Sequence, residues 1–142
     1  METKIFVDTN VLLDYIMKRE SYYEDAREIM SLFTSGKKRG CVAAHSITNI
    51  FYILRKSYSL KERRALLLNI CKIFHVEEIT KHKIIDSLVN EKIDDFEDCL
   101  QIECAKSYGA HYIITRDVGD YLASEVQAIL PKDFLSLYYE NE

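Results

Sequence analysis

The amino-acid sequence predicts an α/β fold built around a mainly parallel sheet. Short apolar runs alternate with longer segments that carry apolar residues at helical spacing, an order typical of parallel strands covered by helices. Two Ser-x-x-Glu capping signatures mark helix starts, and a glycine or proline lies at several of the predicted ends. We expect a single domain spanning residues 1–142.

The first strand and the first helix are predicted at the N-terminus. Ile5–Val7 is an apolar run bounded by polar residues, which indicates a buried strand. Thr9 or Asn10 can cap a helix that follows at once, with Val11 and Leu12 on its apolar face. Asp8 is therefore expected at the carboxyl end of a strand, where open α/β sheets bind their ligands.

The later elements follow from the same signals. Further strands are expected at residues 41–44, 76–79, 112–115 and 126–130, and helices over 21–34, from 46, from 59, over 80–92, over 95–108 and from 131. Capping boxes at Ser21-x-x-Glu24 and Ser59-x-x-Glu62 open two of these helices. Gly109 is expected to end the helix over 95–108.

Acidic residues recur at the ends of predicted elements. Asp117 follows the strand at 112–115, and Asp98 lies in the acid-rich start of the helix over 95–108. Three separated segments can thus bring carboxylates, including Asp8, to one edge of the sheet. Carboxylates about 4 Å apart repel by roughly 1 kcal/mol in water and about 4 kcal/mol at an effective dielectric of 20. A cation, a proton or solvent must offset this repulsion, and Mg²⁺ and Mn²⁺ favour such oxygen ligands.

Composition excludes several classes of protein. The net charge of −4 argues against a protein that coats duplex nucleic acid. The sequence has no Gly-rich loop of a P-loop or dinucleotide-binding enzyme. It also has no apolar run long enough to span a bilayer and no secretory leader. We therefore expect a cytoplasmic protein with no membrane partner.

Three motifs together resemble those of PIN-domain ribonucleases. The segment 8–14 is similar to their opening motif, and Asp98–Gln101 with Ala105 to their central acidic helix. Thr115–Asp117, followed by Asp120 and Tyr121, is similar to their late acidic turn. The resemblance implies a PIN-like three-layer α/β/α sandwich with a central, mainly parallel sheet of four to five strands. The size of the chain is similar to that of VapC-like toxins from toxin–antitoxin pairs.

The resemblance also implies a mechanism. Asp8, Asp98 and Asp117 would be catalytic and would hold Mg²⁺ or Mn²⁺, and a metal-activated water would hydrolyse RNA phosphodiesters. Asn10 would position the site. Asn49 stands where many family members carry a glutamate, so the site loses one negative charge while keeping an amide oxygen that could ligate.

Further residues are predicted to support this site. Glu97 or Asp95 could compensate for the missing charge, and Ser46 opens the helix that carries Asn49. Arg116 could pair with Asp117 or with a phosphate. Asp120 is expected to be structural rather than catalytic. For Asp14, a place behind the site and a solvated pair with Lys18 are both open.

The implied partners are an RNA substrate and a small antitoxin protein, and a homodimer is possible. Several tyrosines could form a protein-binding surface or could pack into the core: Tyr15, Tyr22, Tyr23, Tyr52 and Tyr58. Two alternative functions remain open at this point. One is a catalytically weak or inactive PIN-like domain that binds RNA or protein. The other is a small phosphatase of the haloacid-dehalogenase type, although Asp8-Thr9-Asn10 lacks the second aspartate of its motif.

Overall fold

The structure, a computed structural model that describes residues 2–140, is organised around a five-stranded sheet. The strands are β1 (Ile5–Val7), β2 (Gly40–Ala43), β3 (His75–Glu77), β4 (Tyr112–Ile114) and β5 (Gln127–Ile129). Their order is β3-β2-β1-β4-β5, and every neighbouring pair is parallel. The predicted α/β class with a parallel sheet is therefore confirmed, and β1 occupies its centre.

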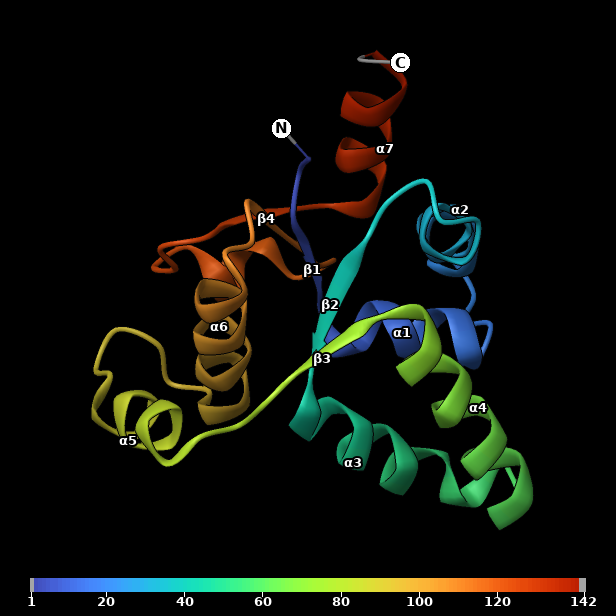
Figure 1. The fold of residues 1–142 in the computed structure, drawn as a ribbon, viewed down its shortest axis with the longest axis horizontal. Helices are drawn as coiled ribbons and strands as arrows, with labels where there is room; N and C mark the ends of the chain where they lie inside the picture. The colour runs from blue at the N-terminus through green and yellow to red at the C-terminus, as the bar shows by residue number, and fades with distance from the viewer. Residues whose placement is uncertain (1, 141–142) are drawn as a thin grey trace.

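Helices cover both faces of this sheet. They are α1 (Thr9–Ile16), α2 (Tyr23–Thr34), α3 (Ala44–Ile53), α4 (Leu60–Ile73), α5 (Lys81–Val89), α6 (Phe96–Tyr108) and α7 (Pro131–Glu140), with 3₁₀ turns η1 (Leu54–Lys56) and η2 (Val118–Tyr121). Figure 1 shows α5 and α6 on one side of the strands and α1 to α4 on the other. This arrangement gives three layers, as expected. Among residues 2–140, none of the helices has the length and apolar character needed to cross a bilayer.

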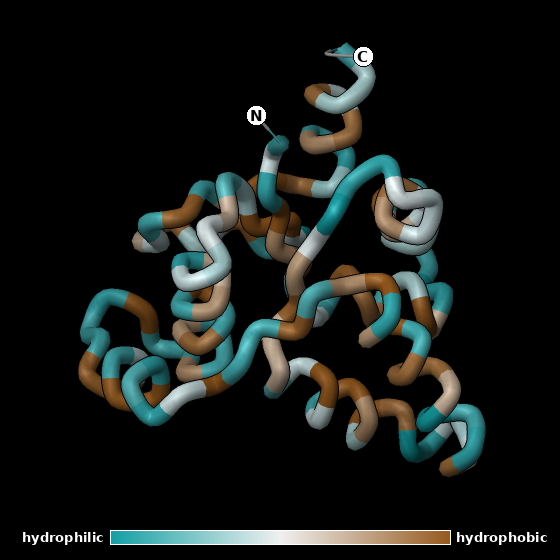
Figure 2. The backbone as a smooth tube through the Cα atoms, in the orientation of Figure 1, coloured by the Kyte–Doolittle hydropathy of each residue, from teal (hydrophilic) through white to brown (hydrophobic). Residues whose placement is uncertain are grey.

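The alternation of side chains along β1 explains the two cores. Ile5 and Val7 pack with apolar residues of α1, α2, α4 and α7, whereas Phe6 packs on the opposite face with residues of α6 such as Cys104. Successive side chains of a strand point to opposite faces, so an unbroken apolar run is required where both faces are covered. Figure 2 shows this hydrophobic centre along the strands.

Most predicted helix starts agree with the structure, and one does not. The capping box at Ser59 is confirmed, because Glu62 N donates to Ser59 Oγ at 3.1 Å and Ser59 N donates to Glu62 Oε1 at 3.0 Å. The capping box at Ser21 is wrong. Ser21 has a left-handed φ of 75°, and the N-cap of α2 is Tyr22, which makes no side-chain capping bond. Glu24 instead binds Arg27 one turn along the helix.

Element boundaries differ from the predictions by a few residues. The helix after β2 begins at Ala44 rather than Ser46. The helix expected over 80–92 ends at Val89, and Thr80 caps its start by accepting from Lys83 N at 3.2 Å. Asp95 and Gly109 bound α6 as expected, with Gly109 in the left-handed region at φ 79°, a conformation that glycine adopts without steric cost.

Candidate active site

The carboxyl edge of the sheet carries a pocket of about 340 Å³. Asp8 follows β1 directly, and the first turn of α6 and the turn after β4 lie beside it. The pocket is lined by Asp8, Thr9, Asn10, Leu13, Asn49, Tyr52, Ile53, Asp95, Glu97, Asp98, Gln101 and Asp120. Six of the nine residues predicted as catalytic or supporting therefore lie along one cavity: Asp8, Asn10, Asn49, Asp95, Asp98 and Asp120.

Asp8 is buried and both of its carboxylate oxygens accept hydrogen bonds. Gln101 Nε2 donates to Oδ1 at 2.9 Å, and Thr115 Oγ1 donates to Oδ2 at 2.7 Å. Although Asp8 is the N-cap residue of α1, its side chain makes no capping bond, so the carboxylate is directed into the site rather than to the helix. Burial raises the pKa of Asp8, and the bonds from Thr115 and Gln101 partly offset that rise.

Asp98 occupies the first turn of α6, whose N-cap Asp95 accepts from Asp98 N at 3.0 Å. Burial raises the pKa of the Asp98 carboxyl to about 7, and the neighbouring carboxylates of Asp95 and Asp8 add to the rise. A carboxyl with such a pKa lies in a crowded, partly dry cluster of negative charge. Near neutral pH, a cation that enters the pocket would therefore favour the ionised form of Asp98, and an anion would favour the protonated form.

Gln101 and Tyr121 connect the two acids. Gln101 Nε2 also donates to Tyr121 Oη at 3.1 Å, and Tyr121 Oη donates to Asp98 Oδ1 at 3.3 Å. Gln101 Oε1 accepts from Thr9 N at 3.1 Å, which fixes the orientation of the amide. Burial raises the pKa of Tyr121, so its hydroxyl stays protonated and remains a donor.

The sequence reasoning missed the roles of Gln101, Thr115 and Tyr121. The available signal for Gln101 was its position three residues after Asp98, which puts both on one face of a helix. Thr115 and Tyr121 lie in the late acidic turn, but nothing local to that turn shows that they reach Asp8 or Asp98.

Asp117 lies beside the pocket and is not one of its lining residues. Its backbone N donates to Thr115 Oγ1 at 3.0 Å, and its Oδ2 accepts from Asn10 Nδ2 at 3.5 Å. Its negative charge is close enough to contribute to the raised pKa of Asp8. Thr115 thus contacts both acids, because it donates to Asp8 and accepts from Asp117.

Ser46 is fully buried behind the pocket, where its Oγ lies 2.6 Å from Thr9 Oγ1. Thr9 also contacts Gln101 through both its N and its Oγ1. Ser46 therefore ties α3 to the start of α1 and supports Gln101 through Thr9.

Arg116 does not have the partner that its sequence position suggested. Its Nε donates to Asp14 Oδ2 at 2.9 Å and its guanidinium stacks on the Tyr22 ring, so it pairs with neither Asp117 nor the pocket acids. The pairing of Asp14 with Lys18 is also wrong. Asp14 is 2% exposed and its second oxygen accepts from Arg19 at 3.4 Å, because α1 turns this face toward the loop after β4.

The donors at this site suit a hard cation, since carboxylate and amide oxygens predominate and no thiol or imidazole lines the pocket. Across residues 2–140, however, no three acidic, histidine or cysteine side chains are gathered closely enough to hold one ion. Asp8 and Asp98 are instead linked indirectly, through the amide of Gln101 and the hydroxyl of Tyr121. Binding of a cation by all three predicted acids would require these side chains to move closer.

Comparison with solved structures shows the same fold in bacterial proteins. VapC20 of Mycobacterium tuberculosis, a toxin that cleaves the sarcin–ricin loop, has a TM-score of 0.69 and 17% identity over 89% of this chain and 99% of its own. A toxin–antitoxin complex from Klebsiella pneumoniae has a TM-score of 0.68 and 16% identity, over 89% of this chain and 97% of its own. VapBC2 from Rickettsia felis, bound to a DNA fragment from its promoter, has a TM-score of 0.64 and 12% identity, over 90% of this chain and 98% of its own. At these identities the likeness concerns the fold alone.

Comparison with curated protein sequences finds no match. The family model of the PIN domain, in contrast, matches residues 4–119. That range extends from the segment before β1 through the turn with Asp117 and ends one residue before Asp120, so it includes every other acid of the pocket. The chain belongs to the PIN-domain family.

Proposed function

We propose that this PIN-domain protein is a metal-dependent endoribonuclease that hydrolyses RNA phosphodiesters and acts as the toxin of a toxin–antitoxin pair. One observation carries the proposal: Asp8 and Asp98 share a pocket at the carboxyl edge of the sheet, where burial and then the neighbouring carboxylates raise the pKa of Asp98 to about 7. Such a pocket favours a divalent cation that offsets the repulsion. The fold shared with toxins, one of which cleaves the sarcin–ricin loop, supports the choice of RNA.

Asp8, Asp98 and Asp117 would hold Mg²⁺ or Mn²⁺, with the amide oxygen of Asn49 or the carboxylate of Asp120 beside them. A bound ion would supply an activated water and would neutralise charge on the scissile phosphate. The choice between the two metals remains part of the proposal, because both prefer oxygen ligands.

The chain's own side chains would position these acids. Gln101 and Thr115 hold the two oxygens of Asp8. Tyr121 donates to Asp98 and Asn10 donates to Asp117. Each acid thus has a neutral donor that keeps its carboxylate in place without adding positive charge to the pocket, which leaves its negative charge available to a cation.

The test is cleavage of RNA by the purified chain with Mn²⁺ or Mg²⁺, beside the variants Asp8→Asn, Asp98→Asn and Asp117→Asn. Each variant keeps the size of the side chain and removes one charge, so we expect at least a hundredfold loss of cleavage with the fold retained. Asp133→Asn, at an exposed position on α7, is the matched control and should cleave like the wild type. Cleavage by all three aspartate variants at the wild-type rate would refute the catalytic assignment.

A protein partner would have to cover the acids. Tyr52 and Ile53 line the pocket and are 61% and 39% exposed, so a partner that buried them would also close the entrance. Tyr22 is exposed as well, whereas Tyr58 packs toward the core and donates to Ile16 O at 3.0 Å. We propose that a small antitoxin binds over Tyr52 and projects a cationic side chain toward the acids. We propose a homodimer as a further assembly of the chain, independent of the antitoxin.

A catalytically weak or inactive binding domain is the second candidate, and one observation favours it. Asn49 lines the pocket where many family members carry an acid, so the negative charge available to a cation is smaller. Calorimetric titration with Mn²⁺ separates the two functions. RNA binding without heat of metal binding and without cleavage would favour the second.

A further inference from the structure

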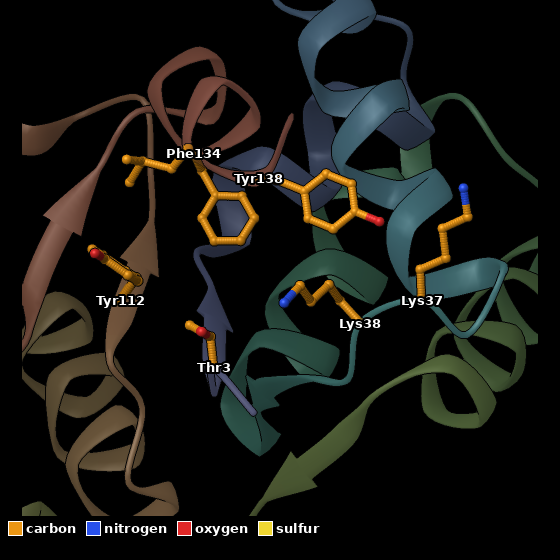
Figure 3. Close-up of a pocket in the computed structure, with 7 residues that line it drawn as sticks. Thr3, Lys37, Lys38, Tyr112, Phe134 and Tyr138 are labelled. Carbon is orange, nitrogen blue, oxygen red and sulfur yellow. The ribbon is translucent and has the colours of Figure 1, made fainter. Parts of the chain in front are cut away.

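A second cavity, of about 320 Å³, lies at the opposite edge of the sheet from the acids. It is lined by Thr3, Lys37, Lys38, Tyr112, Phe134, Leu137 and Tyr138 (Figure 3). Thr3, Lys38 and Tyr112 precede or begin β1, β2 and β4, whereas Asp8 and Asp117 follow β1 and β4. The cavity is therefore separated from the acid pocket by the length of the strands, and the proposed nuclease function does not use it.

Aromatic rings form one side of this cavity. The rings of Tyr112 and Phe134 meet edge to face with centroids 6.1 Å apart. Figure 3 shows the rings of Phe134 and Tyr138 side by side, with Lys38 below Tyr138. Flat aromatic surfaces that border an open space can stack on a planar heterocycle, and nucleobases of every kind present such a face.

Positive charge forms the other side. Lys38 is partly buried, its Nζ lies 5.5 Å from the centroid of the Tyr138 ring, and its side chain extends into the space between Thr3 and Tyr138. Lys37 is exposed at the rim and points away along α2. Within residues 2–140 neither lysine forms an ion pair. A partly buried ammonium group that pairs with no carboxylate of residues 2–140 is available to bind an anion.

The turn that carries these lysines is held in place by its backbone. Lys38 N donates to Leu32 O at 3.0 Å, and Gly36 has a left-handed φ of 77°. The turn is therefore anchored to the end of α2. The backbone of Lys38 is already in place beside the rings of α7 before a ligand binds. This preorganisation lowers the entropic cost of holding a ligand.

We propose that this cavity binds one nucleotide unit, with its base against Phe134 and Tyr138 and its phosphate at Lys38. The chemistry is that of single-strand binding sites, which combine stacking on aromatic side chains with cations along the phosphate backbone. The same unit could come from an RNA strand or from a free nucleotide. In the first case the inference rests on the proposed function, and the site would anchor RNA several nucleotides away from the repelling acids.

The test measures binding rather than cleavage, so that it does not depend on the nuclease site. The full chain is titrated in EDTA against a fluorescent single-stranded RNA of roughly ten nucleotides, within the usual range of single-strand sites. Adenosine monophosphate and inorganic phosphate are then used as competitors. Displacement by the monophosphate at similar concentration indicates a free-nucleotide site, whereas displacement only by RNA indicates a strand. Both outcomes support the pocket if the variants below behave as expected.

Four variants test the side chains. Lys38→Gln should weaken RNA binding at low salt and reduce the slope of log affinity against log salt by about 0.7, as expected for one lost phosphate contact on a single strand. Tyr138→Leu should weaken binding by about fivefold or more through lost stacking, and Tyr138→Phe should retain it. Lys61→Gln, at an exposed position on α4, should bind like the wild type.

The proposal is overturned by any of three results. These are an absence of binding by both RNA and the monophosphate, wild-type affinity in Lys38→Gln, or an equal loss in Lys61→Gln. Melting curves of each variant show whether α7 remains packed, and Lys38→Gln decides the matter if Tyr138→Leu fails to fold. Cleavage by the wild type with Mn²⁺, measured separately, shows whether a negative result concerns this cavity or the nuclease function.

Discussion

The ionisation of Asp98 depends strongly on its surroundings. Its pKa rises from 3.8 to about 7, first through burial and then through the carboxylates of Asp95 and Asp8. In the folded protein this carboxyl keeps its proton at pH values where the unfolded chain has lost it. Asp98 therefore stabilises the fold fully below pH 3.8, and that contribution is lost as the pH rises toward 7.

The raised pKa of Asp98 predicts how Asp98→Asn changes stability in the absence of metal. The amide cannot ionise, so the variant should gain stability relative to the wild type as the pH is raised from 5 to 8. Denaturant unfolding in EDTA at several pH values measures the difference between the two proteins, in which titrating groups distant from Asp98 cancel. A difference that does not change with pH would show that Asp98 ionises normally in the folded state.

Asn49 offers a second test at the residue scale. Asn49→Asp adds a carboxylate to the lining of the pocket, so we expect tighter Mn²⁺ binding and lower stability without metal, because the new charge repels Asp8 and Asp98. Calorimetric titration measures the first effect and unfolding in EDTA the second. Asn69→Asp, at an exposed position on α4, controls for the change in net charge. Unchanged affinity would place Asn49 outside the metal site.

At the scale of elements, α1 and the loop after β4 are joined behind the pocket. Asp14 of α1 accepts from Arg116 at 2.9 Å and from Arg19 at 3.4 Å. Arg116 directly precedes Asp117 in the sequence, so this buried carboxylate holds the segment that carries one of the proposed catalytic acids. Asp14 is therefore a positioning residue for that loop.

Asp14→Asn should loosen this loop. The amide keeps the size of the side chain but loses the charge that both arginines face, and we expect a loss of about 1.5–3 kcal/mol of unfolding free energy, typical of hydrogen bonds to charged groups. Hydrogen exchange should increase over residues 115–121. Arg27→Gln breaks the exposed pair with Glu24 and should change stability by less than about 1 kcal/mol. Equal effects of the two variants would contradict the positioning role.

For the whole molecule, metal binding should appear as stability. If Mn²⁺ binds only the folded chain, a hundredfold excess over its dissociation constant adds about 2.7 kcal/mol. Melting curves with and without Mn²⁺ measure the shift, and Asp8→Asn should reduce it. A wild-type melting temperature that Mn²⁺ leaves unchanged, together with no heat of binding, would argue against the metal site.

The proposed toxin activity predicts an effect on cells. Induced expression of the chain alone should arrest growth and degrade a specific RNA, whereas expression of Asp8→Asn should not, because both require the acids of the pocket. Immunoblotting must show equal amounts of the two proteins. Equal growth of the two strains with intact RNA would favour the binding-domain alternative.

The sequence by itself determined the local features of this protein. The apolar run Ile5–Val7, the capping box at Ser59 and the helix from Asp95 to Gly109 were predictable because burial periodicity and capping bonds involve residues a few positions apart. The same local reasoning placed Asp8 at a strand end. It failed at Ser21, where the left-handed φ of the turn overrides the capping pattern.

Only the tertiary structure decided which side chains meet. Thr115 and Asp8 are 107 residues apart, as are Asp117 and Asn10, and each pair forms because β4 lies beside β1 in the sheet. The partner of Arg116 and the meeting of Lys38 with the rings of α7 likewise depend on strand order and helix packing. Periodicity along the chain specifies which face of an element is buried, whereas the identity of the neighbour across that face is set by how the whole sheet assembles.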